Sequence, residues 1–377
     1  MYEEILNNIN TVTEYKEGDK LSPINKAYFT KPISKDNFHI INATNQTPNK
    51  ITSNQPSTNQ ITSIPTNKKL CFIDGGSSEL LRAPNFSLFF IRTYANITKD
   101  NKTIADKKIE FYCLAKTKIK DGKIFYGVDL FLDKKADPAM NNFLPSKEDL
   151  EMFSFDKTLV VGENRAEISK LGDVARRFAE IKLATELISK LDEGIIILDG
   201  NLRATFTNET KYLDELYEKA IANNVLITGL CKTSNLLTEK GNNIINVLNY
   251  LAVKNDIKEN WYYHPVCSIE EPKHNVEMLF LKLNQASEYI FRFEVHKPQF
   301  HKEQLGELLT LLVKNSNDYS FPGYPYGLIK ADHLARIPNQ EKEFLKSKIL
   351  LTLKQQDQKN ITSCLKALDA HDVLDRK

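Results

Sequence analysis

Two aspartates each end an apolar segment and are each followed by glycine, and this shared pattern predicts a pair of carboxylates at one edge of a sheet. Asp74 ends the run KLCFID before Gly75-Gly76, and Asp199 ends GIIILD before Gly200. A buried strand carries a carboxylate only at its end, because an unpaired charge in the core is costly. Two neighbouring carboxylates raise each other's pKa unless a cation lies between them, and oxygen ligands suit Mg²⁺ or Mn²⁺. Asp-Gly is also a common turn pair, so a plain turn remains the alternative for each.

A glutamate on a predicted helix could complete this acidic cluster. Residues 168–191 carry apolar side chains at helical spacing, and Glu180 lies among them in ARRFAEIKLATEL. Glu186 lies on a different face of the same predicted helix and competes for the role. Either glutamate could instead be a solvated residue on an exposed face.

Two further segments place polar side chains where they could meet a phosphate. GLCKTS puts Lys232 at the end of an apolar run, where it could contact a phosphate or simply face solvent. GYPYGLIKADHLARI begins as an aromatic loop around Tyr324 and continues as a short helix with Asp332 and His333. An aromatic ring beside an acid fits a site where a base stacks while its phosphate meets a metal, although tyrosine-rich loops more often only pack.

The elements that must position these residues alternate between strands and helices. After the strand ending at Asp74, β-branched and aromatic runs predict an antiparallel meander, followed by a long helix, a strand, a helix and a strand. This order is typical of a ribonuclease-H-like α/β fold, a mixed sheet flanked by helices, here with a hairpin and a mainly helical C-terminal part after it. The predicted ranges are Lys69–Asp74, Asn85–Ile97, Lys108–Lys116 and Lys123–Leu130 for the first strands, Ile168–Leu191 for the long helix, Gly194–Asp199, Tyr212–Ala222 and Val225–Cys231 for the strand–helix–strand unit, Glu277–Leu283 and Tyr289–His296 for the hairpin, and Leu328–Ile337 for a short helix.

The composition is that of a soluble globular protein. The chain has 377 residues, of which 41% are hydrophobic and 27% charged, and no apolar run reaches the ~18 residues of a membrane span. The N-terminus lacks an apolar signal core, and the five cysteines show no metal-binding spacing, so we expect a cytoplasmic protein with reduced cysteines. The net charge of +2 neither demands nor excludes nucleic acid. The positive charges of a DNA-binding channel and the negative charges of a metal site would nearly cancel in the total.

One polar segment divides the chain. Residues 41–68 are rich in Asn, Thr, Gln, Ser and Pro, which predicts a flexible linker or insertion. It separates an N-terminal segment, residues 1–40, from a main domain at residues 69–340. Residues 341–377 are predicted to form a C-terminal helical extension.

Five motifs in order resemble the NurA nucleases, a family that works with the hexameric ATPase HerA in processing DNA ends. They are FIDGGSS, RRFAE ahead of ILDGNL, GLCKTS, FRFE at Phe291–Glu294, and GYPYGLIKADHLARI, and they span about Asp74 to Ile337. Each motif alone is weak, and the order of all five makes the resemblance specific. Residues before Lys69 carry none of it.

The resemblance implies roles for individual residues. Asp74, Glu180 and Asp199 match the metal-binding acids of the family, and Tyr324 matches its active-site tyrosine. The family often has histidine directly after the alanine of the last motif, where this chain has Asp332 followed by His333. Either Asp332 serves as an oxygen ligand, or His333 supplies an imidazole from a shifted turn.

The resemblance also implies an activity and partners. The activity is hydrolysis of DNA phosphodiesters with Mn²⁺ (or Mg²⁺) by a two-metal mechanism, as a 5′–3′ exonuclease on DNA ends and an endonuclease on single strands, in end resection and double-strand break repair. A homodimer enclosing a channel would dock on a HerA-type ATPase. Ile5, Ile9 and Val12 could line one helical face for that contact, or could pack on their own domain.

Other functions stay open at this point. An actin-like ATPase or sugar-kinase-type ATP-binding protein shares the ribonuclease-H-like core, and IDGGSSE could be its first phosphate loop. Such a protein needs a second phosphate loop and a Gly-Gly pair at its adenosine site. The one Gly-Gly pair of this sequence, Gly75-Gly76, already belongs to the candidate first phosphate loop. A non-catalytic clamp subunit that loads the ATPase onto DNA would need none of the three acids. RNA-cleaving and junction-resolving enzymes of the same fold also remain possible.

Overall fold

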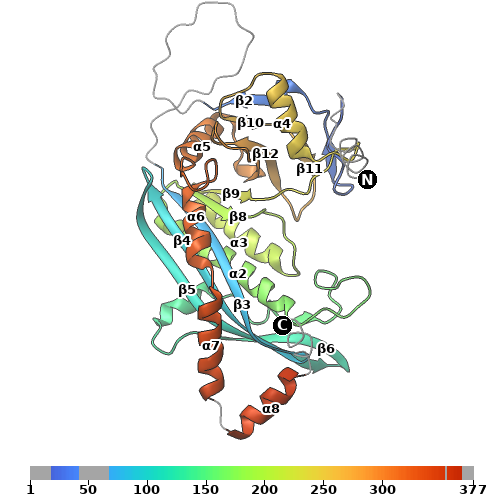
Figure 1. Cartoon of the computed structure of the whole chain (residues 1–377), viewed down its shortest axis with the longest axis vertical. Coiled ribbons are helices and arrows are strands. Elements are labelled where there is room, and N and C mark those ends of the chain that lie inside the picture. Colours follow the sequence, from blue (N-terminus) through green and yellow to red (C-terminus); the bar gives the residue numbers. More distant parts are fainter. Residues whose placement is uncertain (1–17, 42–67, 353–354, 367–377) are drawn as a thin grey trace, which may run out of the picture.

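The computed structural model describes residues 18–41, 68–352 and 355–366. Within them the chain forms an 11-stranded mixed sheet with helices on both faces, and a separate pair of strands, β1 (Tyr28–Thr30) and β11 (Cys267–Ile269) (Figure 1). None of the described helices has the length and apolar character needed to span a membrane. Nearly all of the linker predicted at residues 41–68 lies outside the described residues, as do Ile5, Ile9 and Val12.

The centre of the sheet has the strand order of a ribonuclease-H-like fold. Five strands lie in the order β5-β4-β3-β8-β9, with β3, β4 and β5 antiparallel and β8 parallel to both β3 and β9. Helix α2 connects the meander to β8, and α3 connects β8 to β9, so the predicted fold class is confirmed. The bounds are β3 Leu70–Ala83, β4 Phe86–Lys99, β5 Lys102–Lys120, α2 Lys170–Leu187, β8 Ile195–Asp199, α3 Glu209–Ala222 and β9 Leu226–Cys231.

Further strands extend the sheet on both sides. The predicted hairpin is present as β12 (Val276–Lys282) and β13 (Phe291–His296), with β13 pairing to β9. Next to β12 lie β10 (Trp261–Tyr263) and β2 (Phe38–Ile40), so residues from before the polar segment form an edge of the main sheet. Beyond β5 follow β6 and β7, at Lys123–Phe131 and Met152–Phe153. The division of the chain at residues 40, 68 and 340 stays a prediction.

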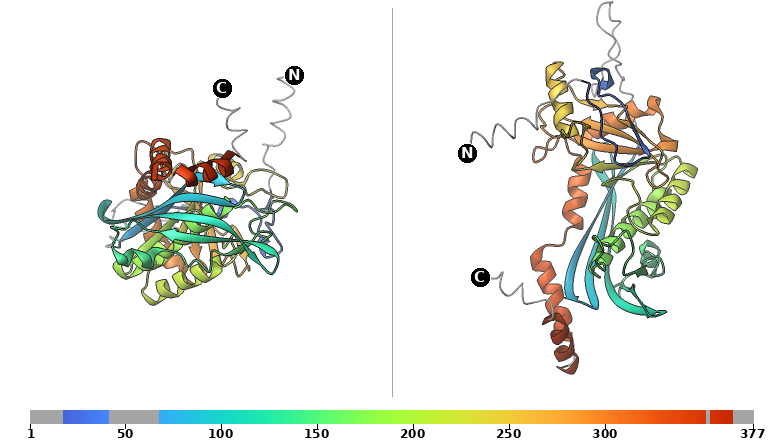
Figure 2. Two further views of the ribbon diagram at one scale, coloured as in Figure 1. Left: turned by 90° about the horizontal axis from the view of Figure 1, so that it is seen from below. Right: turned by 90° about the vertical axis from the view of Figure 1, so that its right-hand side faces the viewer.

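The apolar residues of the central strands alternate between two cores. Cys71 and Ile73 of β3 belong to one apolar cluster, whereas Leu70 and Phe72 belong to the other. Helices α2 and α3 cover the first face, and α6 (Tyr326–Ala335) covers the opposite face (Figure 2). Side chains of α4 (Ile244–Lys254) pack into the first cluster and those of α5 (Lys302–Asn315) into the second.

The C-terminal part is helical, as predicted. Helix α6 begins and ends two residues earlier than the range 328–337, and α7 (Asn339–Thr352) and α8 (Gln355–Lys366) follow it. The guanidinium of Arg92 on β4 fastens this part to the sheet. Its Nη1 donates to the backbone oxygen of Arg336 at 2.9 Å, and Nη2 lies 2.5 Å from Oε1 of Glu341.

The strand that begins at Lys69 does not end at Gly75-Gly76, contrary to the prediction. Strand β3 continues through both glycines to Ala83, paired with β4 throughout. Only the pairing of β3 with β8 ends here, and its last residue pair is Ile73 with Leu198.

Close packing explains the two glycines better than a turn does. A Cβ on Gly75 would lie 2.5 Å from Oε1 of Glu180, and a Cβ on Gly76 would lie 2.3 Å from the backbone oxygen of Ala335. Gly75-Gly76 therefore allows α2 and α6 to approach the strand from opposite faces. Because these residues are in the middle of a strand, they form no phosphate loop, and the ATP-binding alternative loses its main support.

Candidate metal centre

Asp74 and Asp199 lie side by side on neighbouring parallel strands. The register of β3 and β8 sets Ile73 beside Leu198, so the two aspartates come next, where β8 ends. Phe72, two residues before Asp74, belongs to the cluster on the α6 side, and residues two apart on a strand share a face. Both carboxylates therefore project toward α6.

Helix α6 brings a third carboxylate to this pair. One oxygen each from Asp74, Asp199 and Asp332 lie within 4.8 Å of one another. The next residue, His333, is exposed. Of the two readings of the last motif, the structure brings Asp332 and not His333 to the other acids.

Glu180 approaches from the opposite face of the sheet. It is 3% exposed, and the missing side chain of Gly75 leaves the space that its carboxylate occupies. The carboxylate is ion-paired with Arg176, and its Oε2 lies 3.8 Å from Nη1 of Arg177. Glu180 is thus next to Asp74 but neutralised in part by its own helix.

Glu186, the competing glutamate, points elsewhere. Its Oε1 lies 3.5 Å from Nζ of Lys182 and 3.7 Å from Nζ of Lys219 on α3. It belongs to the contact between α2 and α3, and the structure does not bring it to the aspartates.

Burial and mutual repulsion dominate the electrostatics of the cluster. Burial, and then the charges of Asp199 and Glu180, raise the pKa of Asp74 to about 8, although Lys232 acts in the opposite direction. Burial also raises the pKa of Glu180, against the effect of Arg176. Asp74 and Glu180 therefore lack enough nearby positive charge to offset their burial.

Lys232, directly after β9, lies among the aspartates. Its Nζ is 2.6 Å from Oδ2 of Asp199 and 2.7 Å from Oδ1 of Asp332. Arg336 Nη2 lies 2.7 Å from the other oxygen of Asp332. Burial alone would raise the pKa of Asp332, but the hydrogen bond and charge of Lys232, with Arg336, leave that pKa lowered.

Tyr324 reaches the cluster only with its hydroxyl. The side chain is 1% exposed, and its OH donates a long hydrogen bond of 3.5 Å to Oδ1 of Asp199. The ring stacks on Phe321, with 5.2 Å between centroids, and also packs against Phe291. Because protein atoms cover this ring, Tyr324 itself has no free face for a base, and base stacking on this loop stays a prediction.

The donor set fits a hard divalent cation. All four acids offer carboxylate oxygens, and three of them can reach one point. The raised pKa of Asp74 indicates that a cation between these groups would relieve their repulsion. Oxygen ligands without imidazole or thiolate match Mg²⁺ or Mn²⁺ better than zinc.

Sequence reasoning missed the arginines that hold the acids. Arg176 contacts Glu180, and Arg177 donates to Oε1 of Glu209 at 2.8 Å and to the backbone oxygen of Asn201 at 2.9 Å. The latter bonds fix the loop that follows Asp199. The four-residue spacing within RRFAE was the signal for the first pair, since such residues are neighbours on a helix.

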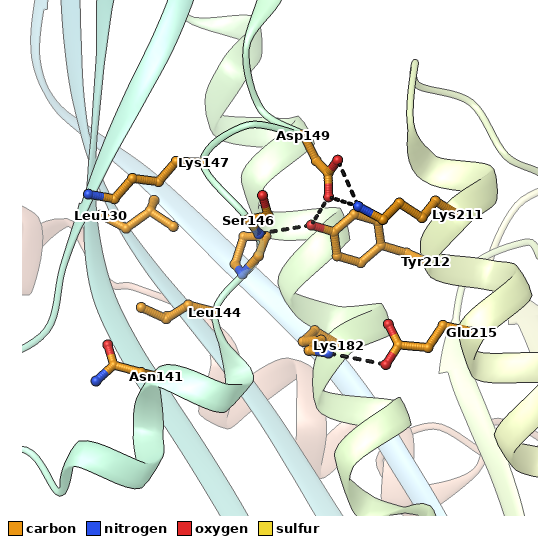
Figure 3. Close-up of a pocket in the computed structure, with 11 residues that line it drawn as sticks. Leu130, Asn141, Leu144, Ser146, Lys147, Asp149, Lys182, Lys211, Tyr212 and Glu215 are labelled. Carbon is orange, nitrogen blue, oxygen red and sulfur yellow. Dashed lines mark hydrogen bonds and ion pairs between the residues drawn. The ribbon is translucent and has the colours of Figure 1, made fainter.

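A cavity of about 500 Å³ lies elsewhere, between the loop at residues 141–149 and helices α2 and α3 (Figure 3). Four of its charged side chains are paired with one another: Lys211 contacts Asp149, and Lys182 contacts Glu215. None of the predicted site residues lines it, so it is distinct from the carboxylate cluster.

Comparison with known proteins gives the following similarities. No curated protein sequence matches the chain. Among solved structures, the chain is similar to endonuclease V from Ciona intestinalis, solved with a 24mer DNA, at 12% identity and a TM-score of 0.37, covering 75% of this chain and 90% of that one. Human endonuclease V gives 12% identity and a TM-score of 0.34, with 74% and 86% covered. A. aeolicus Argonaute gives 10% identity and a TM-score of 0.34, with 72% and 29% covered.

A family model, the NurA domain, matches residues 68–337. This range contains Asp74, Glu180, Asp199, Lys232 and Asp332 and the elements that position them. The chain therefore belongs to the NurA family of nucleases.

Proposed function

We propose that this protein is a deoxyribonuclease that depends on Mn²⁺ or Mg²⁺ and acts on DNA ends as a 5′–3′ exonuclease and on single strands as an endonuclease. The observation that carries the proposal is the meeting of Asp74, Asp199 and Asp332 within 4.8 Å at the edge of a ribonuclease-H-like sheet. Glu180 completes the ligand set from the other face. The three aspartates are partly buried, so their attraction for a cation is screened less than that of fully exposed carboxylates.

The chain's own residues have distinct tasks in this proposal. Asp74, Asp199, Asp332 and Glu180 hold the cations, and Lys232 meets the charge of the phosphate. Tyr324 orients the carboxylate of Asp199 through its hydroxyl. Two bound cations would supply an activated water and stabilise the leaving 3′ oxygen.

The cellular role is proposed by family membership. We infer a cytoplasmic homodimer that works with a HerA-type hexameric ATPase in end resection and double-strand break repair. The five cysteines Cys71, Cys113, Cys231, Cys267 and Cys364 are free, which favours a reducing compartment. Light scattering at micromolar concentration tests the dimer, and a monomer there would refute it. Co-purification with the ATPase tests the partnership.

One assay tests the activity. End-labelled single-stranded DNA, duplex DNA and RNA are incubated with the protein in Mn²⁺, Mg²⁺ or EDTA. We expect cleavage of both DNA substrates with either metal, none in EDTA, and shortening from the 5′ end of duplexes. The clamp alternative predicts DNA binding without cleavage under every condition, and preferential cleavage of RNA would reassign the substrate.

A further inference from the structure

A second cavity, of about 530 Å³, begins beside the carboxylate cluster. Its walls come from the loops after β8 and β9, from β13 and from residues 22–28. Asn201 is two residues beyond Asp199, and Thr233 directly follows Lys232, so their Cα atoms are within about 8 Å and 4 Å of those residues. The lining residues are Ser22, Pro23, Ile24, Tyr28, Asn201, Arg203, Thr233, Ser234, Asn235, Leu236, Leu237, His274 and Arg292.

The lining of this cavity is basic and neutral, and each of its two arginines is paired with a glutamate outside the lining, Arg203 with Glu271 at 3.0 Å and Arg292 with Glu294 at 3.1 Å. No carboxylate is among the residues that line it, whereas two guanidiniums, from Arg203 and Arg292, are. Amides and hydroxyls provide further hydrogen-bond donors, and the aliphatic residues supply an apolar wall. Such a surface is suited to a phosphate attached to a flat apolar group.

The walls are fixed by one buried carboxylate in the FRFE motif. Glu294 is 0% exposed; its Oε2 accepts from the backbone N–H of Leu202 at 2.8 Å and contacts Nε2 of His274 at 2.9 Å. The other ring nitrogen of His274 lies 2.5 Å from the hydroxyl of Tyr28. The loop after Asp199 and the segment that contains Tyr28 are therefore both linked to Glu294, directly or through His274. These bonds hold the walls in place, so the cavity is preformed.

One wall has a polar atom that lacks a partner. Ser234 is 8% exposed, and within the described residues its hydroxyl is buried without a hydrogen-bond partner. A buried hydroxyl without a partner costs about 1–3 kcal/mol, so a site that keeps one is suited to a ligand that completes the bond.

Residues from outside the family match close the cavity. The backbone N–H of Ser22 donates to the oxygen of Leu237 at 2.7 Å, and Leu21 forms a bridge with Thr238. These bonds join the segment at residues 18–41 to the loop after Lys232. The family model matches this chain only from residue 68, so this wall comes from residues outside the matched range.

We propose that this cavity binds the nucleotide next to the cleaved phosphate of a single DNA strand, with Arg203 contacting the strand's phosphate. The proposal rests on the proposed nuclease function. The cavity has the volume of a small-ligand site, which suits one unstacked nucleotide and excludes a duplex. A strand with one phosphate at the carboxylates has its neighbouring nucleotide beside Asn201 and Thr233.

The first test compares two exposed, ion-paired arginines. Arg203 pairs with Glu271 at 3.0 Å, and Arg82 pairs with Glu167 at 2.8 Å at the far end of β3. For cleavage of a labelled single strand in Mn²⁺, we expect Arg203→Gln to raise KM about tenfold and to leave kcat within about twofold of the wild type. The slope of log affinity against log salt concentration should also fall by about one, the value for one lost phosphate contact. Arg82→Gln should match the wild type. An equal KM and salt slope in both variants would overturn the proposal.

The second test adds a charge at the mouth of the cavity. Ile24 is 40% exposed there, and Ile119 is exposed on β5 away from it. By fluorescence anisotropy of a labelled 12-nucleotide strand in EDTA, Ile24→Glu should weaken binding about tenfold and Ile119→Glu should not. This binding measurement needs no cleavage, so the two proposals can fail separately. If the wild type cleaves no DNA, the nuclease proposal fails. If Ile24→Glu and Ile119→Glu bind the strand equally well, the proposal that the cavity binds a nucleotide is rejected.

Discussion

Nζ of Lys232 lies 2.6 Å from Oδ2 of Asp199, where two parallel strands end side by side. The same ammonium is 2.7 Å from Asp332, so it bridges two of the proposed metal ligands. An ammonium and a divalent cation seek the same oxygens, and this lysine must turn away from them when metal binds.

Removing this ammonium should therefore separate metal binding from turnover. We expect Lys232→Met to bind Mn²⁺ several-fold more tightly, because a competing charge is gone, and to lower kcat about 100-fold, because no cation meets the phosphate. Calorimetric titration with Mn²⁺ and single-turnover cleavage measure the two effects. Lys211→Met, which removes a lysine paired with Asp149, is the control. Weaker Mn²⁺ binding in Lys232→Met would contradict the competition.

Loss of either central aspartate should abolish cleavage. Asp74→Asn and Asp199→Asn each remove one charged ligand without a change in side-chain volume, and we expect at least an about 1,000-fold fall in activity. Circular dichroism should show an unchanged fold. Asp214→Asn, at an exposed position of α3, is the control. Cleavage at near the wild-type rate in either variant would disprove the metal-site assignment.

The raised pKa of Asp74 also predicts how stability depends on pH. Its pKa rises from 3.8 to about 8 on folding, so between these values the folded state binds the extra proton. The free energy of unfolding of the wild type should then decrease as pH rises from about 4 to about 8. In EDTA, Asp74→Asn should be more stable than the wild type at pH 8, by an amount on the order of a few kcal/mol, and equal to it near pH 4.

Urea denaturation at the two pH values measures this difference. Adding Mn²⁺ should stabilise the wild type and leave Asp74→Asn unchanged, because only the wild type keeps the site. A variant that is less stable than the wild type at pH 8 would show that burial of the Asp74 charge and its repulsion by Asp199 and Glu180 do not destabilise the folded protein.

The two glutamates of α2 should differ sharply. Glu180 lies beside Asp74, whereas Glu186 contacts Lys182 and Lys219. We expect Glu180→Gln to lower Mn²⁺-dependent cleavage about 100-fold and Glu186→Gln to stay within about twofold of the wild type. A greater loss at Glu186 would refute the assignment.

Asp332 and His333 are likewise separable by substitution. We expect Asp332→Asn to cripple Mn²⁺-dependent cleavage, and His333→Ala, which alters an exposed residue, to have little effect. Because the raised pKa of Asp74 means that a proton leaves this carboxyl when metal binds, metal affinity should rise with pH between 5 and 7 even without an imidazole ligand. A fall in activity through pH 6.5 that is seen in the wild type and is absent from the pH profile of His333→Ala would identify the histidine as the working group.

The central strands were predictable because their signal is long and local. Strands such as β8 are buried on both faces and read as continuous apolar runs. Strands β1, β2, β10 and β11 have three residues each, too few for any periodicity, and their pairing depends on distant partners. Gly75-Gly76 was misread because the same dipeptide is typical of turns; only the contact with Glu180 reveals the other reason for a glycine.

The candidate site was predictable as far as its residues follow strands. Asp74 and Asp199 share a sequence pattern that the register of two strands explains. Choosing between Asp332 and His333 required the rotation of α6 on the sheet, which the sequence alone does not provide. Arg92 went unnoticed because its partners Arg336 and Glu341 are far along the chain.

Strand β2 has a practical consequence for any shortened version of this protein. It covers the outer edge of β10 through three residue pairs, from Phe38 beside Tyr263 to Ile40 beside Trp261. A recombinant fragment trimmed to residues 68–337 would expose that edge, with unpaired backbone groups between aromatic side chains. Bare edges of this kind recruit other extended chains, so the trimmed fragment should precipitate or self-associate, whereas one that starts at residue 18 should stay in solution.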